Sequence, residues 1–549
     1  MRTSYRRVLA AAAAVTIMVS LGAWPAVAVE DEVVDPPADQ PQPLEDPTDP
    51  LPAASPSSSP ALELSSAGPA WTAPKVQLLA GDDRFATAAA VSREGWPDPV
   101  PAVVLASGQD YPDALAAAAL AGVVGGPLLL TGQASLHPAA AEELERLTPE
   151  TVYIVGGKKA VSAPVADAIE DLGAGVERIA GADRYETALK VAGAVVELGG
   201  DPSVVLLASG AGFADALSAS SIAAGLLHPI MLLAEGTDPA ELAEQLQALG
   251  AGKIIVVGGA AAVPDAPLSA LEDYERIAGA DRTATAAAVA DRAREMGLDG
   301  TPALASAETF PDGLAGGAFA GAIRRGPVLL TGKAQLAPAV MEWVAADQPE
   351  RIVQLGGAGA VGQLAACQLA SGEARSWRCV EEELARQGYN AGAIDGKVDH
   401  QSPWAVFALQ KVAGIKVTGK FGDAEWTALA SAPTLPARHP ELPGDHIEID
   451  LARQLLLVYR GGDMAHAFHT SSGKPSTPTV RGIFTVYRKL DYRNASNMYK
   501  PIYFYKRYAI HGYPSVPLHP ASAGCARMYD GDADMLWPMV SMGERVAVY

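Results

Sequence analysis

Cysteine, lysine and long apolar stretches are scarce in this sequence, and its composition excludes several classes of protein. The three cysteines and nine histidines are scattered over 549 residues and offer no zinc-ligand spacing. Beyond the N-terminal residues, no stretch is long, apolar and uncharged enough to span a bilayer. The net charge of −22 argues against a nucleic-acid partner, and against adhesion to anionic polymers unless basic residues cluster locally.

Nucleotide-binding loops are missing from the sequence as well. No Gly-x-Gly-x-x-Gly follows a strand with an acidic residue at the expected distance, and no Gly-Lys-Ser/Thr occurs. We therefore expect no cofactor and no metal.

The first 28 residues have the composition of an export signal. A basic start with three arginines precedes an apolar stretch over residues 8–21, and Ala26-Val27-Ala28 is a small-x-small cleavage site. A retained membrane anchor is the alternative, but the apolar stretch is short and is broken near Trp24-Pro25. We predict cleavage, export and a mature chain without a transmembrane segment.

Residues 29–75 are predicted to be a disordered linker. They contain eleven prolines, nine acidic residues and one lysine, so they offer too little apolar surface to form a core. The remaining chain is too long for one core, and we expect three or more domains.

Three short motifs recur in one order over residues 76–361. The first is Gly-x-Asp-Arg, the second is an aromatic residue followed by x-Asp-Ala/Gly-Leu, and the third is an apolar run that ends in Gly-Gly. The first motif begins at Gly81, Gly181 and Gly279, the second begins at Tyr111, Phe213 and Phe310, and the third ends at Gly157, Gly259 and Gly357. This recurrence indicates duplication, with units at 76–175, 176–273 and 274–365.

Each unit alternates apolar runs with alanine-rich stretches. Residues 102–106, 127–131 and 152–155 are typical of buried parallel strands, whereas residues 113–124 and 139–147 are typical of crossover helices. We predict three tandem α/β repeats.

The three motifs together resemble the cell-wall-binding repeat of Gram-positive surface proteins. The resemblance implies three copies around a pseudo-threefold axis that hold the protein non-covalently to wall polymers. Each Asp-Arg pair is either a salt bridge within a turn or a ligand contact, and the sequence leaves both open: Asp83/Arg84, Asp183/Arg184 and Asp281/Arg282.

Residues 366–433 are predicted to form a small helical domain, with helices over 379–387, 403–413 and 423–430. The pattern from Gln387-Gly388-Tyr389 to Trp426-Thr427-Ala428-Leu429 resembles the three-helix peptidoglycan-binding domain. A structural spacer domain is the alternative. Residues 434–444 contain three prolines and are predicted to be a second linker.

The cysteines divide into a pair and a single residue. Cys367 and Cys379 lie twelve residues apart, and in an oxidising compartment their disulfide would add about 3 kcal/mol of stability. Two buried free thiols are the alternative. Cys525 is left over, and an odd cysteine in an exported protein is a candidate reactive thiol.

Residues 445–549 are predicted to be a β-rich domain around Cys525, with strands over 447–450, 455–459, 465–470 and 482–487. His511 precedes the thiol by fourteen residues, Gly524 is adjacent to it, and Arg527 follows two residues later. These residues can supply nucleophile, base, oxyanion donor and anion contact for acyl transfer through a thioester. The thiol needs the base because it is mostly protonated at neutral pH.

This segment resembles the L,D-transpeptidase catalytic domain over its whole length. The matching motifs are Asp450-Leu451-x-x-Gln454-x-Leu456, Ser472-Gly473-Lys474, Thr477-Pro478, Gly482-Ile483-Phe484, Ile510-His511-Gly512 and Ser522-x-Gly524-Cys525-x-Arg527-Met528. The resemblance implies a β-sandwich that joins peptidoglycan stem peptides through two diaminopimelate residues, in 3-3 cross-links. A thiolate attacks the third residue of a donor tetrapeptide and expels the terminal D-alanine, and an acceptor amine resolves the thioester.

We assign predicted roles to seven residues. The predicted catalytic residues are Cys525 as nucleophile, His511 as general base and proton donor, Gly524 as backbone oxyanion donor and Ser522 as loop support. The predicted substrate-binding residues are Arg527, Gly512 and Tyr513. For Arg527 a structural pairing with Asp530 or Asp532 is an equal alternative.

One position departs from the family pattern. Ala523 stands where the family usually has histidine, so an imidazole beside the thiol is missing. His519 on the same loop can replace it or can be an ordinary surface histidine.

The sequence as a whole predicts an exported wall enzyme that acts on peptidoglycan stem peptides. The rival hypotheses are an L,D-carboxypeptidase that uses the same thiol, and an inactive wall-binding protein. Abundant alanine and glycine with little lysine indicate a GC-rich genome, so we expect the wall of a Gram-positive, actinobacterial cell.

Overall fold

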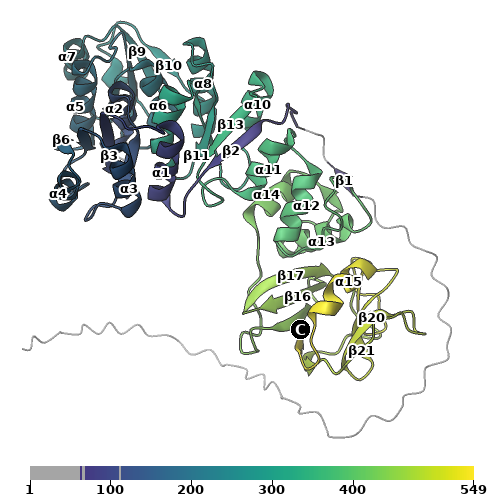
Figure 1. The fold of residues 1–549 in the computed structure, drawn as a ribbon. Helices are drawn as coiled ribbons and strands as arrows, with labels where there is room; N and C mark the ends of the chain where they lie inside the picture. The colour runs from purple at the N-terminus through teal and green to yellow at the C-terminus, as the bar shows by residue number, and fades with distance from the viewer. Residues whose placement is uncertain (1–61, 65–67, 111–112) are drawn as a thin grey trace, which may run out of the picture. The chain divides into compact units, whose positions relative to one another are not determined.

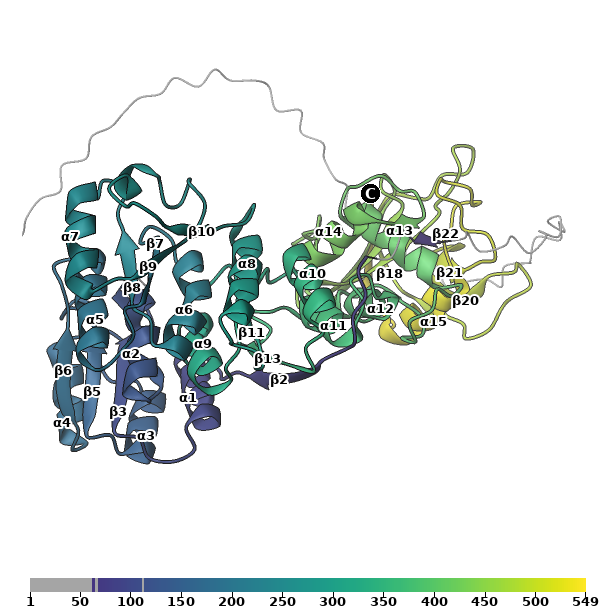
Figure 2. The ribbon, with the colours of Figure 1, turned by 90° about the horizontal axis from the view of Figure 1, so that it is seen from above.

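The computed structural model describes residues 62–64, 68–110 and 113–549 (Figure 1, Figure 2). The predicted export signal and most of the first linker lie outside this range. In the described part of that linker, β1 (Glu63–Leu64) pairs in parallel with β14 (Lys420–Phe421), and Trp71 is buried. None of the helices in the described ranges has the length and apolar character that crossing a bilayer requires.

Three four-stranded parallel sheets form the repeat region. In sheet order, the first contains β4 (Leu128–Thr131), β3 (Ala102–Ser107), β5 (Thr151–Val155) and β6 (Gly175–Ile179). The second contains β8 (Ile230–Leu233), β7 (Val204–Ser209), β9 (Lys253–Val257) and β10 (Glu275–Ile277). The third contains β12 (Val328–Thr331), β11 (Ala303–Ser306), β13 (Arg351–Leu355) and β2 (Lys75–Leu79).

The fourth strand of each sheet comes from a neighbouring unit of the sequence repeat. β6 and β10 open the second and third units, yet each completes the sheet of the unit before it. β2 opens the first unit and pairs with β13, so the start of the repeat region completes its last sheet. The motif spacing establishes the length of the repeat but not the sheet that each strand joins.

Helices link these strands, and the predicted strand and helix segments of the first unit correspond to elements of the structure. The first unit has α1 (Arg84–Gly95), a 3-10 turn (Asp113–Ala116), α2 (Ala117–Val124), α3 (Pro138–Leu147) and α4 (Ala163–Asp171). The second has α5 (Arg184–Glu197), α6 (Ala214–Leu226), α7 (Pro239–Leu249) and a 3-10 turn (Ala266–Leu268). The third has α8 (Arg282–Glu295), α9 (Pro311–Ala318), a π-helical turn (Phe319–Ile323), α10 (Pro338–Asp347) and α11 (Gln363–Ser371).

The helices α2, α6 and α9 that follow the second motif pack against one another (Figure 2). Small residues permit this close packing: a Cβ on Gly122 of α2 would lie 2.4 Å from the carbonyl oxygen of Ala224, and one on Gly321, in the π-helical turn after α9, would lie 2.1 Å from that of Ser221. The alanine-rich composition therefore reflects a core shared by the three units.

The Gly-x-Asp-Arg motif begins a helix in each unit. Asp83 is the N-cap of α1 and accepts hydrogen bonds from two backbone N–H groups, and Asp183 and Asp281 do the same for α5 and α8. The arginine side chains donate to backbone carbonyls near the second motif: Arg84 to Gly108, Arg184 to Gly210 and Arg282 to Ala307, at 2.8–2.9 Å. The motif thus builds the helix start and its connection to the next loop, which favours a structural role.

The second and third motifs meet next to that arginine. Asp215 of the second motif is half-buried, and this burial raises its pKa while the nearby Arg282 of the following unit opposes the rise. Gly258 of the third motif has φ +116°, and a Cβ there would lie 2.5 Å from Asp215 Oδ2. The three recurring motifs therefore form a contact between consecutive units.

Replacing Gly258 with alanine is expected to destabilise the repeat region by about 1–3 kcal/mol or more, because a positive φ and a steric clash coincide. Gly236→Ala is the matched control, since a Cβ at Gly236 has no atom within 4 Å. Urea unfolding of the full chain followed by circular dichroism measures the difference. Equal transitions for the two variants would contradict the proposed contact.

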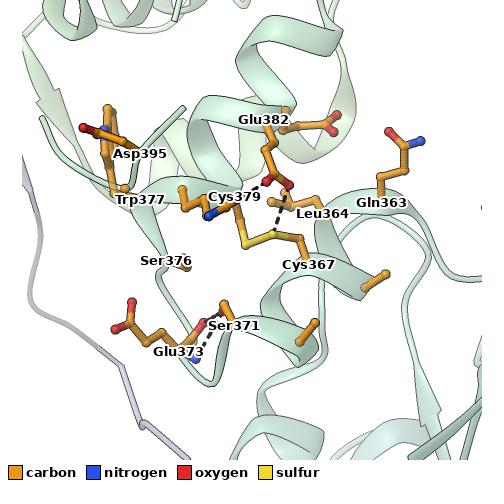
Figure 3. A pocket seen from close by; sticks show the side chains of 15 residues that line it. Gln363, Leu364, Cys367, Ser371, Glu373, Ser376, Trp377, Cys379, Glu382 and Asp395 are labelled. Carbon is orange, nitrogen blue, oxygen red and sulfur yellow. Dashed lines mark hydrogen bonds and ion pairs between the residues drawn. A yellow bond between two sulfur atoms is a disulfide. The ribbon is translucent and has the colours of Figure 1, made fainter. Parts of the chain in front are cut away.

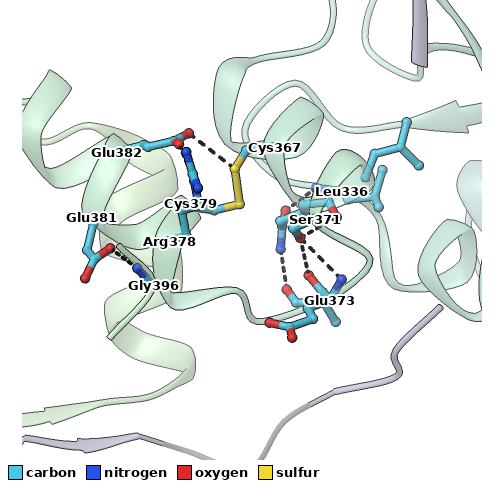
Figure 4. The surroundings of a disulfide bond; sticks show 12 residues. Leu336, Cys367, Ser371, Glu373, Arg378, Cys379, Glu381, Glu382 and Gly396 are labelled. Carbon is cyan, nitrogen blue, oxygen red and sulfur yellow. Dashed lines mark hydrogen bonds and ion pairs between the residues drawn. A yellow bond between two sulfur atoms is a disulfide. The ribbon is translucent and has the colours of Figure 1, made fainter. Parts of the chain in front are cut away.

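The helical domain follows the repeats. It contains α12 (Trp377–Arg386), α13 (Ser402–Val412) and α14 (Asp423–Ser431), close to the three predicted helices. A disulfide joins Cys367 on α11 to Cys379 on α12, so the last helix of the repeats is covalently tied to the first helix of this domain (Figure 4).

The C-terminal domain consists of two sheets around a common core. In sheet order, the first contains β17 (Asp463–His469), β16 (Leu455–Arg460), β15 (His446–Asp450), β23 (Arg545–Val548) and β18 (Gly482–Thr485). The second contains β19 (Arg488–Lys489), β20 (Tyr499–Tyr505), β21 (Tyr508–Gly512) and β22 (Ala526–Met528). Helix α15 (Asp530–Met539) follows β22, and the sequence analysis did not predict it.

Candidate active site

Cys525 lies immediately before β22, at the end of a long connection from β21. The two strands pair in parallel, with Ile510 opposite Ala526 and His511 opposite Arg527. The chain thus leaves β21 after His511, crosses over and returns beside it. In this register Cys525 is level with Ala509, so His511 is diagonal to it, two residues further along β21 and on the same face of the sheet because successive side chains alternate.

The loop before the thiol is held by its own serine. Ser522 Oγ donates to the carbonyl oxygen of Cys525 at 2.5 Å and accepts from the N–H of Gly524 at 3.0 Å. Ser522 is buried, so these two bonds close a tight turn. This geometry agrees with the predicted loop support by Ser522.

Gly524 has the one backbone conformation in this turn that requires glycine. Its φ is +121°, and a Cβ would lie 2.8 Å from Cε1 of Tyr508. Its N–H, which we predicted to face an oxyanion, instead donates to Ser522. The difference arises because the turn itself needs the donor, so an oxyanion would have to displace the serine hydroxyl.

His511 is buried, and its Nδ1 lies 2.9 Å from the carbonyl oxygen of Gly512. A carbonyl can only accept, so Nδ1 carries the hydrogen and Nε2 is left as the basic nitrogen. Burial, together with the positive charges of Arg527 and Arg493, lowers the pKa of His511 to about 4. The imidazole is therefore neutral at pH 7 and can accept a proton.

The Cys525 side chain is partly exposed, and its thiol donates to the carbonyl oxygen of Arg507 at 3.7 Å. Burial of the sulfur raises the pKa of Cys525, which Arg527 partly offsets. Within the described ranges the thiol makes no hydrogen bond to His511, and the raised pKa of Cys525 with the lowered pKa of His511 leaves both groups neutral at pH 7.

The predicted substrate-binding residues surround this pair. The Arg527 guanidinium lies 4.0 Å above the ring of Tyr513, and that ring meets His511 edge-on at 5.9 Å. Gly512 is packed against Asp530 and Tyr499, and its carbonyl orients His511.

The alternative pairing of Arg527 with an aspartate does not occur in the structure. Asp530 forms an ion pair with Arg493, and Asp532 accepts from Gln401 and Asn390. Among the described residues Arg527 has no ion-pair partner, so its guanidinium remains available to a carboxylate of a ligand.

Two of the motifs that resemble the L,D-transpeptidase family form hydrogen bonds with the loop before the thiol. The carbonyl of Ser472 accepts from the N–H groups of Ala521 and Ser522, and Lys474 and Thr477 donate to the carbonyl of Ser522. Gln454, to which the sequence analysis gave no role, exchanges two hydrogen bonds of 2.8 Å with Ser472. The position of Gln454 in the matched motif at 450–456 is the sequence feature that could have indicated this role.

The departure at Ala523 leaves a small exposed side chain beside the thiol. His519 is exposed as well, and within the described ranges its ring has no hydrogen-bond partner; only its backbone carbonyl is bound, by Ser471. The position of His519 favours the ordinary surface histidine over a replacement for the missing imidazole.

A cavity of about 910 Å³ lies elsewhere, beside the Cys367–Cys379 disulfide (Figure 3). Helices α11 and α12 line it, with residues that include Leu364, Trp377, Glu382 and Asp395. The two cysteines that line this cavity are bonded to each other, and all of its lining residues come from the segment 363–396. The cavity therefore contributes nothing to chemistry at Cys525.

Comparison with known families agrees with this organisation. Cell wall binding domain 2 (CWB2) matches residues 79–166, 178–267 and 276–365, the putative peptidoglycan binding domain matches 375–429, and the L,D-transpeptidase catalytic domain matches 444–548. The chain contains all three kinds of domain, in the predicted order. The resemblances seen in the sequence are thereby confirmed.

Relatives resemble parts of this chain. N-acetylmuramoyl-L-alanine amidase LytC of Bacillus subtilis (strain 168) is 29% identical over 47% of this chain and 51% of its own length. The amidase enhancer of the same organism is 27% identical over 37% of this chain and 28% of its own length. The chain thus spans about half of the first relative and less of the second.

Two solved structures are similar to parts of this chain. Cwp6 from Clostridium difficile has 24% identity and a TM-score of 0.52, covering 69% of this chain and 66% of its own, which shows a similar fold. The L,D-transpeptidase (residues 123-326) from Xylanimonas cellulosilytica DSM 15894 has 31% identity and a TM-score of 0.30, covering 32% of this chain and 93% of its own.

Proposed function

We propose that this protein is a cell-wall-associated L,D-transpeptidase that forms 3-3 cross-links through a thioester on Cys525. The catalytic-domain match and the wall-binding repeats support a peptidoglycan-modifying enzyme held at the bacterial surface. The observation that supports the cysteine mechanism is the parallel pairing of β21, which contains the buried His511, with β22, which directly follows Cys525. An actinobacterial origin stays a prediction.

The proposed reaction has two acyl transfers. His511 Nε2 takes the proton of the Cys525 thiol, and the sulfur attacks the carbonyl carbon of the donor's third residue. The bond to the terminal D-alanine breaks, and its nitrogen leaves with the proton from the imidazolium. An acceptor amine then attacks the thioester, loses a proton to His511, and the thiol is restored as sulfur takes that proton back.

Mass spectrometry of the full chain with a tetrapeptide stem tests this function. We expect release of D-alanine and a covalent tripeptidyl adduct on Cys525, and a cross-linked dimer once an acceptor stem is added. A carbapenem should add its mass to the same residue, and Cys525→Ala should acquire neither adduct.

Two outcomes would favour the rival hypotheses. D-alanine release without a dimer in the presence of acceptor would indicate an L,D-carboxypeptidase. The absence of both adducts from the wild-type chain would leave a wall-binding protein without this activity.

A further inference from the structure

A buried lysine of the helical domain reaches into the C-terminal domain. Lys411, near the end of α13, has its Nζ 2.6 Å from Nδ1 of His469 on β17, and it donates to the carbonyl oxygen of Gln454 at 2.9 Å. Both side chains are buried. These two contacts give the buried amine of Lys411 hydrogen-bond partners, and an unpaired buried polar group would cost folding free energy.

The chemistry of this pair fixes the hydrogen positions. The neutral His469 ring carries one hydrogen, and the carbonyl of Val516 can only accept, so that hydrogen lies on Nε2. Nδ1 therefore accepts from the Lys411 amine, whose pKa burial lowers to about 7. His469 Nε2 is 3.1 Å from the carbonyl oxygen of Val516 and therefore donates to it. Burial lowers the pKa of His469 to about 3, which keeps the ring neutral as this arrangement requires. A continuous hydrogen-bond chain thus runs from α13 to Val516.

Val516 belongs to the connection between β21 and β22 that ends at the thiol. Its side chain packs in a small apolar cluster with Trp404 and Phe407 of α13. Trp404 also stacks on the ring of His469, with ring centroids 5.6 Å apart, and on Tyr529 at 5.3 Å. The same helix therefore holds this connection by both polar and apolar contacts.

The helical domain also holds the residues that follow the thiol strand. Asp532 at the start of α15 is buried and accepts from Gln401 Nε2 at 2.5 Å and from Asn390 Nδ2 at 3.0 Å. Asn390 donates to the carbonyl of Gly531 as well, at 3.0 Å. Cys525 and β22 thus lie between two attachments to the helical domain, one before the thiol and one after it.

From these contacts we infer that the helical domain is a positioning element of the catalytic centre, with Lys411 and His469 as positioning residues that act on Cys525 through Val516. The inference rests on the proposed function. It assigns to a domain of the peptidoglycan-binding type a second task, which is to fix the geometry of the thiol loop.

Substitution of Lys411 by methionine in the full chain tests the polar chain. Methionine keeps the apolar stem but removes the donor, so His469 Nδ1 loses its partner and Nε2 no longer has a fixed hydrogen for Val516. We expect the rate of carbapenem acylation at Cys525 to fall about tenfold, with faster amide hydrogen exchange in residues 513–525. Lys416→Met is the matched control, because Lys416 is an exposed lysine four residues beyond α13, and it should change neither measurement.

A pair of substitutions at His469 separates positioning from general stability. Glutamine can accept from Lys411 with its oxygen and donate to Val516 with its nitrogen, so His469→Gln should retain most of the acylation rate. His469→Leu removes both bonds and should resemble Lys411→Met, and the double variant with Lys411→Met should show no further loss.

Unchanged exchange in residues 513–525 for Lys411→Met and His469→Leu would overturn the inference. Equal acylation losses for His469→Gln and His469→Leu would also overturn it, because a restored hydrogen-bond chain should rescue the rate. Hydrogen exchange does not depend on activity, so a wild-type chain that is not acylated would contradict the proposed function while leaving this test intact.

Discussion

Replacing His511 with alanine is expected to lower D-alanine release from a tetrapeptide donor by about 10²- to 10⁴-fold. The structure gives the reason: Nδ1 is held by the carbonyl of Gly512, which leaves Nε2 as the proton acceptor beside a thiol that is protonated at rest. His519→Ala is the matched control, since His519 is the exposed histidine on the same connection. A loss for His519→Ala as large as that for His511→Ala would show that the exposed imidazole takes part.

The pH dependence of thiol alkylation gives a second readout of the same pair. The pKa of His511 is lowered to about 4 and the pKa of Cys525 is raised, so between these values the neutral pair dominates over a thiolate–imidazolium pair. The thiolate fraction then grows steadily with pH, and the iodoacetamide rate of the wild-type chain should rise from pH 6 to 9. A rate that is flat over this range would indicate a preformed ion pair and contradict the assignment.

The repeat region could be predicted from the sequence because its three motifs carry structural information. Asp83 caps a helix, Arg282 reaches the neighbouring unit and Gly258 accommodates Asp215, so each recurring feature of the pattern has a local physical cause. The closure of the third sheet by β2 could not be predicted in this way. Which sheet accepts a strand depends on packing among units, which residue spacing does not record.

In the candidate site, too, residue spacing predicts some features, whereas others depend on packing and backbone conformation. The motifs predict Cys525 and His511 as the candidate pair, because this prediction needs only residue type and spacing. They did not identify the bond from Gly524 to Ser522, which depends on the turn conformation. They also did not identify Lys411 and His469, because a single lysine or histidine looks like a surface residue until tertiary packing buries it.

Gly524→Ala is expected to reduce acylation of Cys525 by about 10²-fold, because the turn that presents the sulfur has to move. Alanine at φ +121° is strained, and its Cβ would meet the ring of Tyr508 at 2.8 Å. Gly543→Ala is the control for backbone strain alone, since Gly543 has φ +87° and no atom within 4 Å of an added Cβ. Both rates are measured by intact mass after carbapenem treatment at a temperature where the variants are folded.

A second substitution distinguishes the two causes of that loss. Tyr508→Ala removes the ring that the new methyl group would strike, but it leaves the positive φ of residue 524 unchanged. If the steric clash dominates, Gly524→Ala combined with Tyr508→Ala should acylate faster than Gly524→Ala alone. If backbone strain dominates, the double variant should stay slow. A wild-type acylation rate for Gly524→Ala would contradict both causes. Cys525 would then react normally in a turn whose conformation differs from the one that the hydrogen bonds of Ser522 hold.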